Sequence, residues 1–190
     1  ENLGTDFLFS EIKYKFHACC HGLHSFLEAL EELKQENNLN PESIEEIAIE
    51  TNPSWLKVCN IQEPKTGLES KFSYKLTAAM SIYGKDTADL GTYNDDICFD
   101  DRINNIRDKV KVIPNDQLSN TQSLISIKDG SRDIKNKHDL SDKIDQNILE
   151  TKIVNKSASL LSKNKSHEIS KMLNAPTASK VSSLVDCLVS

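Results

Sequence analysis

The chain has 190 residues, of which 37% are hydrophobic and 27% are charged, and its formal net charge is −6 at pH 7. This length allows one domain with a real core, or one domain and a tail. The acidic balance argues against a general nucleic-acid or membrane-surface binder and favours small molecules or proteins as partners. We find neither an apolar stretch long enough to span a membrane nor a signal peptide, so a cytoplasmic location is expected.

The first third of the chain predicts a strand, a helix and a second strand. Alternating apolar residues indicate the first strand at residues 12–16. Apolar residues then recur at helical spacing over residues 23–33, and the acidic residues between them, including Glu28, are expected to face water. After a helical turn that Asn40 caps, the second strand is expected at residues 46–50.

The middle of the chain predicts further elements of both kinds. One helix is expected between Lys71 and Gly84, and an acidic stretch precedes another at residues 103–110. Strands are predicted at residues 110–113 and 124–127, followed by the turn signal Asp129-Gly130 of a hairpin that closes the sheet.

The last third of the chain differs from the first two thirds in its amino-acid composition. Lysine, asparagine, serine and aspartate dominate after residue 131, and no aromatic residue follows Phe99, so the core is expected upstream. Helical patterns nevertheless occur at residues 148–160, 169–173 and 181–188. Their apolar stripes need a partner surface, which the first 130 residues are not expected to supply in full.

The run KFHACCHGLH, Lys15 to His24, concentrates titratable and nucleophilic side chains. Lys15 can place a positive charge beside a carboxylate, and His17, His21 and His24 can move protons near neutral pH. A helix that begins within this run would lower the pKa of a thiol such as that of Cys20.

Two other interpretations of this run stay open. In the first, Cys19 and Cys20 are small buried hydrophobic residues and His24 binds the backbone at the helix entry. The second is a zinc site, which is weaker because Cys59 is isolated and no acidic ligand can be picked out. The five cysteines are odd in number and irregularly spaced, so reduced thiols are expected.

The chain resembles the MmgE/PrpD family in several motifs that occur in the expected order. Lys15-Phe16-His17-Ala18, with Cys20 and then His24 opening a helix, resembles the start of that family's second domain. The further matches are Pro64, Thr66 to Glu69, Lys71-Phe72-Ser73, Ala78, Gly84, Asp129-Gly130 and Glu150 to Lys152. The chain departs from the family at Cys19, His21 and Gly22 within the first motif, and residues 130–145 lack the Gly-x-Pro-x-x-Pro-like stretch that is common in the family before the final helices.

The resemblance implies an α+β fold. A two-layer lid domain with a small, mostly antiparallel sheet and packed helices would occupy residues 6–137, and a helical C-terminal tail would occupy residues 138–190. In the family the active site lies between such a lid and a large helical domain, on which the tail would pack. Since that domain is absent and residue 1 is Glu rather than Met, the chain is expected to be an inactive piece of a longer polypeptide.

The resemblance also implies the activity, which is that of a lyase (a dehydratase or decarboxylase) or an isomerase. Its substrate would be a small di- or tricarboxylate such as 2-methylcitrate or cis-aconitate, as in propionate metabolism, and no metal or other cofactor would be needed. The expected partners are this substrate, the helical domain of the same polypeptide and a second copy in a homodimer, with no nucleic acid and no membrane. A non-catalytic binding or oligomerisation module and a small metal-binding protein are the alternatives.

The resemblance implies site residues as well. Lys15, His17, Cys20 and His24 would be catalytic, with Lys15 binding a substrate carboxylate, His17 and Cys20 on the cleft wall or moving protons, and His24 orienting the motif. Lys71 and Ser73 would bind substrate oxygen atoms together with Lys15. An ordinary alternative is that Lys71 is solvated and Ser73 is a helix-entry residue.

Overall fold

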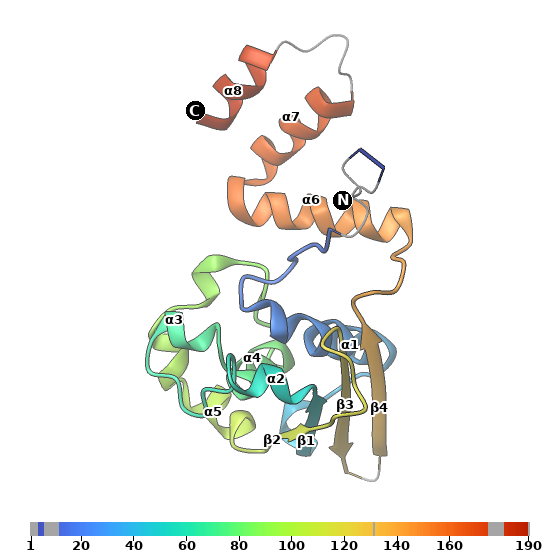
Figure 1. Ribbon diagram of the computed structural model, residues 1–190. Coiled ribbons are helices and arrows are strands. Elements are labelled where there is room, and N and C mark those ends of the chain that lie inside the picture. The colour runs from blue at the N-terminus through green and yellow to red at the C-terminus, as the bar shows by residue number, and fades with distance from the viewer. Residues whose placement is uncertain (1–3, 6–11, 131, 175–180, 190) are drawn as a thin grey trace.

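The computed structural model describes residues 4–5, 12–130, 132–174 and 181–189. Within this part of the chain, a four-stranded sheet and several helices form an α+β body, and three further helices extend away from it (Figure 1). The predicted α+β fold with a helical C-terminal end is therefore confirmed. The predicted domain start, Asp6, lies outside the described residues, and the domain limits stay predictions.

The sheet has the order β2-β1-β3-β4. Its strands are β1 (Ile44–Thr51), β2 (Val110–Pro114), β3 (Gln122–Asp129) and β4 (Arg132–Asp139). β1 pairs in parallel with β2 and antiparallel with β3, and β3 pairs antiparallel with β4. Gly130, with a φ of 57°, lies at the turn between β3 and β4, a conformation that glycine adopts without steric cost. The predicted hairpin and mostly antiparallel sheet are thus confirmed.

The core lies between the sheet and two helices, α1 (His24–Glu36) and α4 (Tyr74–Ile82). α1 packs on β3, β4 and α4, and the rings of Phe26 and Tyr74 are 5.2 Å apart. Leu27 and Leu30 of α1 are fully buried, and each such side chain contributes about 1.5–3 kcal/mol of hydrophobic stabilisation. No residue after Ile127 belongs to the main core of the described residues, as the composition predicts.

Short helices connect these elements. They are η2 (His21–Leu23), η3 (Pro41–Ser43), α2 (Pro53–Leu56), α3 (Gly67–Ser70), η4 (Leu90–Thr92), η5 (Asp96–Phe99) and α5 (Asp101–Arg107). The Asn40 side chain caps η3, as predicted, by accepting a hydrogen bond from the Glu42 N–H group. The predicted helix between Lys71 and Gly84 is confirmed as α4. The capping box that Thr66 and Glu69 form begins a separate short helix, α3, which was not predicted.

Two predictions for the first third of the chain are wrong. Residues 12–16 form no strand. They pair with none of the four strands of the sheet, and the Tyr14 and Phe16 rings stack on each other, 5.9 Å apart. Glu28 does not face water but is buried, 5% exposed. A helical wheel cannot anticipate this burial, because the side chains that cover Glu28 come from distant parts of the sequence.

The tail consists of α6 (Gln146–Leu161), α7 (Lys163–Asn174) and α8 (Val181–Val189). α6 lies across one end of the α+β body, and α7 and α8 stand beyond it (Figure 1). Large apolar side chains of this tail stay exposed, namely those of Ile148, Ile153, Val154, Leu160, Leu173, Val181, Val185, Leu188 and Val189. Across the described residues, every helix is too short or too polar to cross a membrane.

Candidate active site

The loop from Lys15 to Cys20 is held by backbone hydrogen bonds to two distant segments. The Ala18 N–H group donates to the Thr87 carbonyl oxygen (2.8 Å), and the Cys20 N–H group donates to that of Lys71 (2.9 Å). The loop is therefore anchored on both sides before α1 begins, which fixes the positions of its side chains.

His24 lies in the first turn of α1 and is 1% exposed. Its Nε2 atom accepts a hydrogen bond from the His17 N–H group (3.3 Å), and its Nδ1 atom donates to the Cys20 carbonyl oxygen (3.1 Å). Burial, together with the nearby His17, lowers the pKa of His24 to about 3. His24 is thus a neutral residue that orients the loop, and a direct part in proton transfer stays a prediction.

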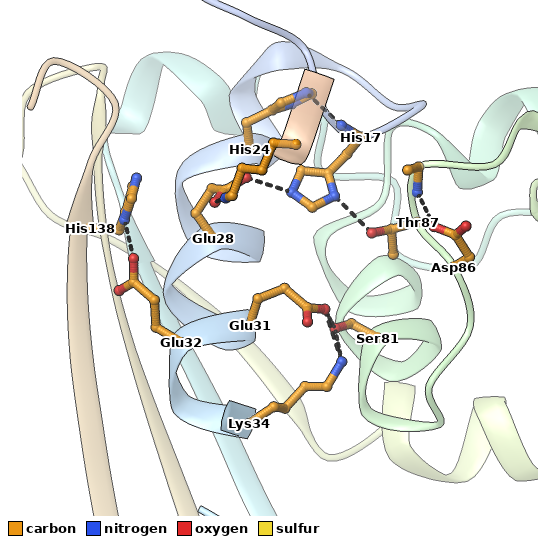
Figure 2. A network of polar contacts seen from close by, with 12 residues as sticks. His17, His24, Glu28, Glu31, Glu32, Lys34, Ser81, Asp86, Thr87 and His138 are labelled. Carbon is orange, nitrogen blue, oxygen red and sulfur yellow. Dashed lines mark hydrogen bonds and ion pairs between the residues drawn. The ribbon is translucent and has the colours of Figure 1, made fainter. Parts of the chain in front are cut away.

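His17 belongs to a buried polar network that joins three segments (Figure 2). The His17 Nδ1 atom lies 2.7 Å from Thr87 Oγ1, and its Nε2 atom lies 3.1 Å from Glu28 Oε1. Lys152, from α6, donates to the other carboxylate oxygen of Glu28. The network therefore connects α1, the loop after α4 and the tail.

Glu28 is ionised in this network. Burial alone would raise the pKa of its carboxyl group, but the hydrogen bond and charge of His17, together with those of Lys152, lower it to about 2. A buried carboxylate is costly unless it is paired and hydrogen-bonded. Glu28 meets both conditions, because each of its oxygen atoms has a partner.

A cavity of about 920 Å³ lies beside this network, between α1, residues 84–88 and α6. His17, Glu28 and Thr87 line it. Its other charged lining residues are Lys34, Lys85, Lys152, Lys156, Lys163, Glu31 and Asp86. The lining contains five lysines and three acidic residues. The cavity is therefore electropositive and suits a small anion.

The other predicted site residues lie outside the cavity lining. Lys15 is exposed, and its charge is close enough to contribute to the lowered pKa values of His21 and His24, although burial is the larger cause in both. The Lys71 ammonium lies 5.8 Å from the centre of the Tyr93 ring. Ser73 is fully buried and caps α4 by accepting from the Leu76 N–H group (3.2 Å), the ordinary alternative considered for it.

The Cys19 and Cys59 thiols are buried and not activated. Cys19 is buried, and this burial raises its pKa to about 12. Burial likewise raises the pKa of Cys59 to about 12, while Cys20 is partly exposed. In the described part of the chain, no three His, Cys, Asp or Glu side chains are grouped to hold a metal ion, and both nitrogens of His17 and His24 already have partners.

Sequence reasoning missed three residues of this site: Glu28, Thr87 and Lys156. A signal existed for Glu28, because it follows His24 by four residues and so shares its helix face. Lys156 donates to the Ala88 carbonyl oxygen (2.6 Å) from α6, across the cavity from α1. No local pattern points to Thr87 or Lys156, whose positions depend on how the loop and the tail fold back.

Two comparisons with known proteins bear on this site. A family model described as the MmgE/PrpD C-terminal domain matches residues 17–175. The matched span contains His17, Glu28, Thr87 and Lys152, and it includes α6 and α7. A search of curated proteins found no match to the chain.

Proposed function

Because the chain belongs to the MmgE/PrpD family, as a C-terminal domain of it, we propose that it is the lid part of a cofactor-independent lyase or isomerase. The proposed substrate is a small di- or tricarboxylate such as 2-methylcitrate or cis-aconitate. Dehydration is the leading reaction, with decarboxylation and epimerisation as its variants, and propionate metabolism is the proposed setting.

The observation that carries this proposal is the lysine-rich cavity beside His17. Removal of a proton next to a carboxylate, or loss of the carboxylate itself, builds negative charge in the transition state. Fixed ammonium groups in a partly desolvated site stabilise such charge. The cavity combines these groups with a histidine network that can hold a proton.

Lys15 has a separate role in the proposal. Its exposed side chain lies on the loop that His24 orients. Its charge is therefore available to a substrate bound between this loop and a partner surface that covers it. We propose that Lys15 binds a substrate carboxylate that is held between this lid and the helical domain of the complete polypeptide. Exposed apolar residues of the tail, such as Leu173 and Val185, support a covering partner of this kind.

The proposal is tested by reading the coding DNA upstream of Glu1 and expressing the whole polypeptide. Turnover of 2-methylcitrate, cis-aconitate and related acids is then followed by proton NMR. We expect Lys15→Ala to lower kcat/KM by about a hundredfold or more, as for the loss of a positioned charge. The control is Lys57→Ala, which removes an exposed lysine outside the cavity lining and should leave turnover near the wild-type value.

Two results would count against the proposal in different ways. Unchanged kinetics of Lys15→Ala would remove Lys15 from the site while leaving the activity standing. A complete polypeptide that turns over none of these acids would instead favour a non-catalytic binding module.

A further inference from the structure

The ionised carboxylate of Glu28 decides which nitrogen atom of His17 carries the proton. A carboxylate accepts hydrogen bonds and cannot donate them. His17 Nε2, 3.1 Å from Glu28 Oε1, must therefore carry a hydrogen whether the ring is neutral or cationic. Lys152 occupies the second oxygen of Glu28, which holds the carboxylate in this orientation.

Thr87 completes the arrangement at the other ring nitrogen. When His17 is neutral, its Nδ1 atom is an acceptor, so the Thr87 hydroxyl, 2.7 Å away, must donate to it. When His17 is cationic, Nδ1 donates to Thr87 Oγ1, and the threonine proton is free to turn toward another acceptor. The hydroxyl hydrogen of Thr87 thus changes its direction with the charge of His17.

Both ring nitrogens of His17 are occupied by protein atoms, so His17 does not meet a ligand directly through them. Thr87 lines the same cavity and holds the nitrogen that can gain or lose a proton. A hydroxyl in this place can pass a proton in either direction between a histidine and a bound molecule.

We infer that Thr87 is a catalytic residue of the proposed active site, exchanging protons between His17 and an anionic ligand in the cavity. His17 acts through Thr87, and Glu28 and Lys152 are positioning residues that keep the ring in one tautomer. This inference rests on the proposed function and assigns its proton transfer to a residue that neither the sequence motifs nor the family match single out.

For loss of water from a hydroxy acid, the step balances as follows. A proton leaves the carbon next to the carboxylate for Thr87 Oγ1, while the threonine's own proton passes to His17 Nδ1. The C–H electron pair forms the C=C bond, and the C–O bond breaks with its pair on oxygen. The reverse transfer then delivers one proton from His17 through Thr87 to the departing oxygen, so that water leaves and both residues regain their starting states.

The kinetic test replaces Thr87 in the complete, active polypeptide. Thr87→Val keeps the shape of the side chain but removes the hydroxyl, and we expect kcat to fall by about a hundredfold or more while KM changes little, as for lost acid–base catalysis. Thr87→Ser restores a hydroxyl and should keep kcat within about tenfold of the wild type.

The matched control is Thr77→Val. Thr77 is also buried, and its hydroxyl donates to the Ser73 carbonyl oxygen (2.7 Å) within α4, away from the cavity lining. Its loss should lower stability without changing kcat. A purely structural Thr87 would behave like Thr77, whereas a catalytic Thr87 loses turnover in a folded protein.

A second readout does not depend on turnover. Nitrogen-15 NMR of the His17 ring should show the proton on Nε2 at neutral pH, and Thr87→Val should shift the Nδ1 resonance while Thr77→Val does not. A proton on Nδ1 with a bare Nε2, or an unmoved Nδ1 resonance in Thr87→Val, overturns the relay even where turnover is found.

The outcomes separate this inference from the proposed function. Wild-type turnover with an unchanged kcat in Thr87→Val overturns the role of Thr87 alone. Absence of wild-type turnover on every acid tested overturns the proposed function and, with it, the catalytic role of Thr87.

Discussion

At the scale of single residues, the buried side chain of Glu28 affects both the stability of the protein and the proposed chemistry. Its carboxylate is tolerated in the protein interior only because His17 and Lys152 occupy its two oxygen atoms. Removal of both partners would leave a buried charge uncompensated, which typically costs about 3–5 kcal/mol. The same pairing fixes the tautomer of His17, so stability and proposed chemistry depend on one carboxylate.

We expect the free energy of unfolding to depend on pH through the ionisation of Glu28. The pKa of its carboxyl group is about 2 in the folded protein, against an ordinary value of 4.5. Its stabilisation is therefore complete above about pH 4.5 and is lost as the pH falls toward 2. The loss is on the order of 3 kcal/mol. Urea unfolding of Glu28→Gln over this window should therefore show a flatter dependence on pH.

Glu36→Gln serves as the control for this experiment, because Glu36 is an exposed residue at the end of α1. Its free energy of unfolding should follow the wild-type pH dependence. Parallel curves for the wild type and Glu28→Gln would show that Glu28 is not the group that titrates.

At the scale of elements, the short helix α3 shows how local signals and close packing combine. Thr66 and Glu69 cap its N-terminus reciprocally. The backbone of Gly67 meanwhile lies against residues 93–94, and its N–H group donates to Asp95 (2.7 Å). A β-carbon at Gly67 would lie 2.4 Å from the Tyr93 carbonyl oxygen, so only glycine allows this approach.

Gly67→Ala is therefore expected to destabilise the protein by about 1–3 kcal/mol, the usual cost of overpacking. The matched control is Gly91→Ala, because a β-carbon there would come no closer than 3.5 Å to the Asp89 side chain. Urea unfolding of both variants tests the difference. Equal midpoints for Gly67→Ala and Gly91→Ala would mean that the contact with Tyr93 relaxes at little cost.

At the scale of the whole molecule, α6 closes the cavity through polar contacts rather than through a core. Lys152 binds Glu28, and Lys156 and Ser159 bind the Ala88 carbonyl oxygen. α6 contains no buried residue, and Val154 and Leu160 stay exposed. α6 should therefore open more readily than α1, whose inner face is buried.

Lys152→Met is expected to speed amide hydrogen exchange in α6 by about tenfold to a hundredfold, since a charge-assisted hydrogen bond contributes about 1.5–3 kcal/mol. Exchange in α1 should change far less. Lys143→Met, which removes an exposed lysine just before α6, is the control. Unchanged exchange of α6 in Lys152→Met would show that other contacts hold the helix in place.

Local patterns predicted much of the architecture. The periodicity of α1, the strands predicted at residues 46–50 and 124–127 and the Asp129-Gly130 turn all depend on neighbours in sequence, and these predictions are confirmed. The failure at residues 12–16 has the same origin, because alternation in a short segment does not decide whether that segment pairs with a distant strand.

The sequence by itself determined the fold class and the family motifs, because short-range spacing encodes them. Only the tertiary structure decided that Glu28 is buried, that Thr87 meets His17 and that Lys152 pairs with Glu28 from 124 residues away. The physical reason is that burial and ionisation depend on which distant groups come together. That arrangement follows from packing of the whole chain and not from any local pattern.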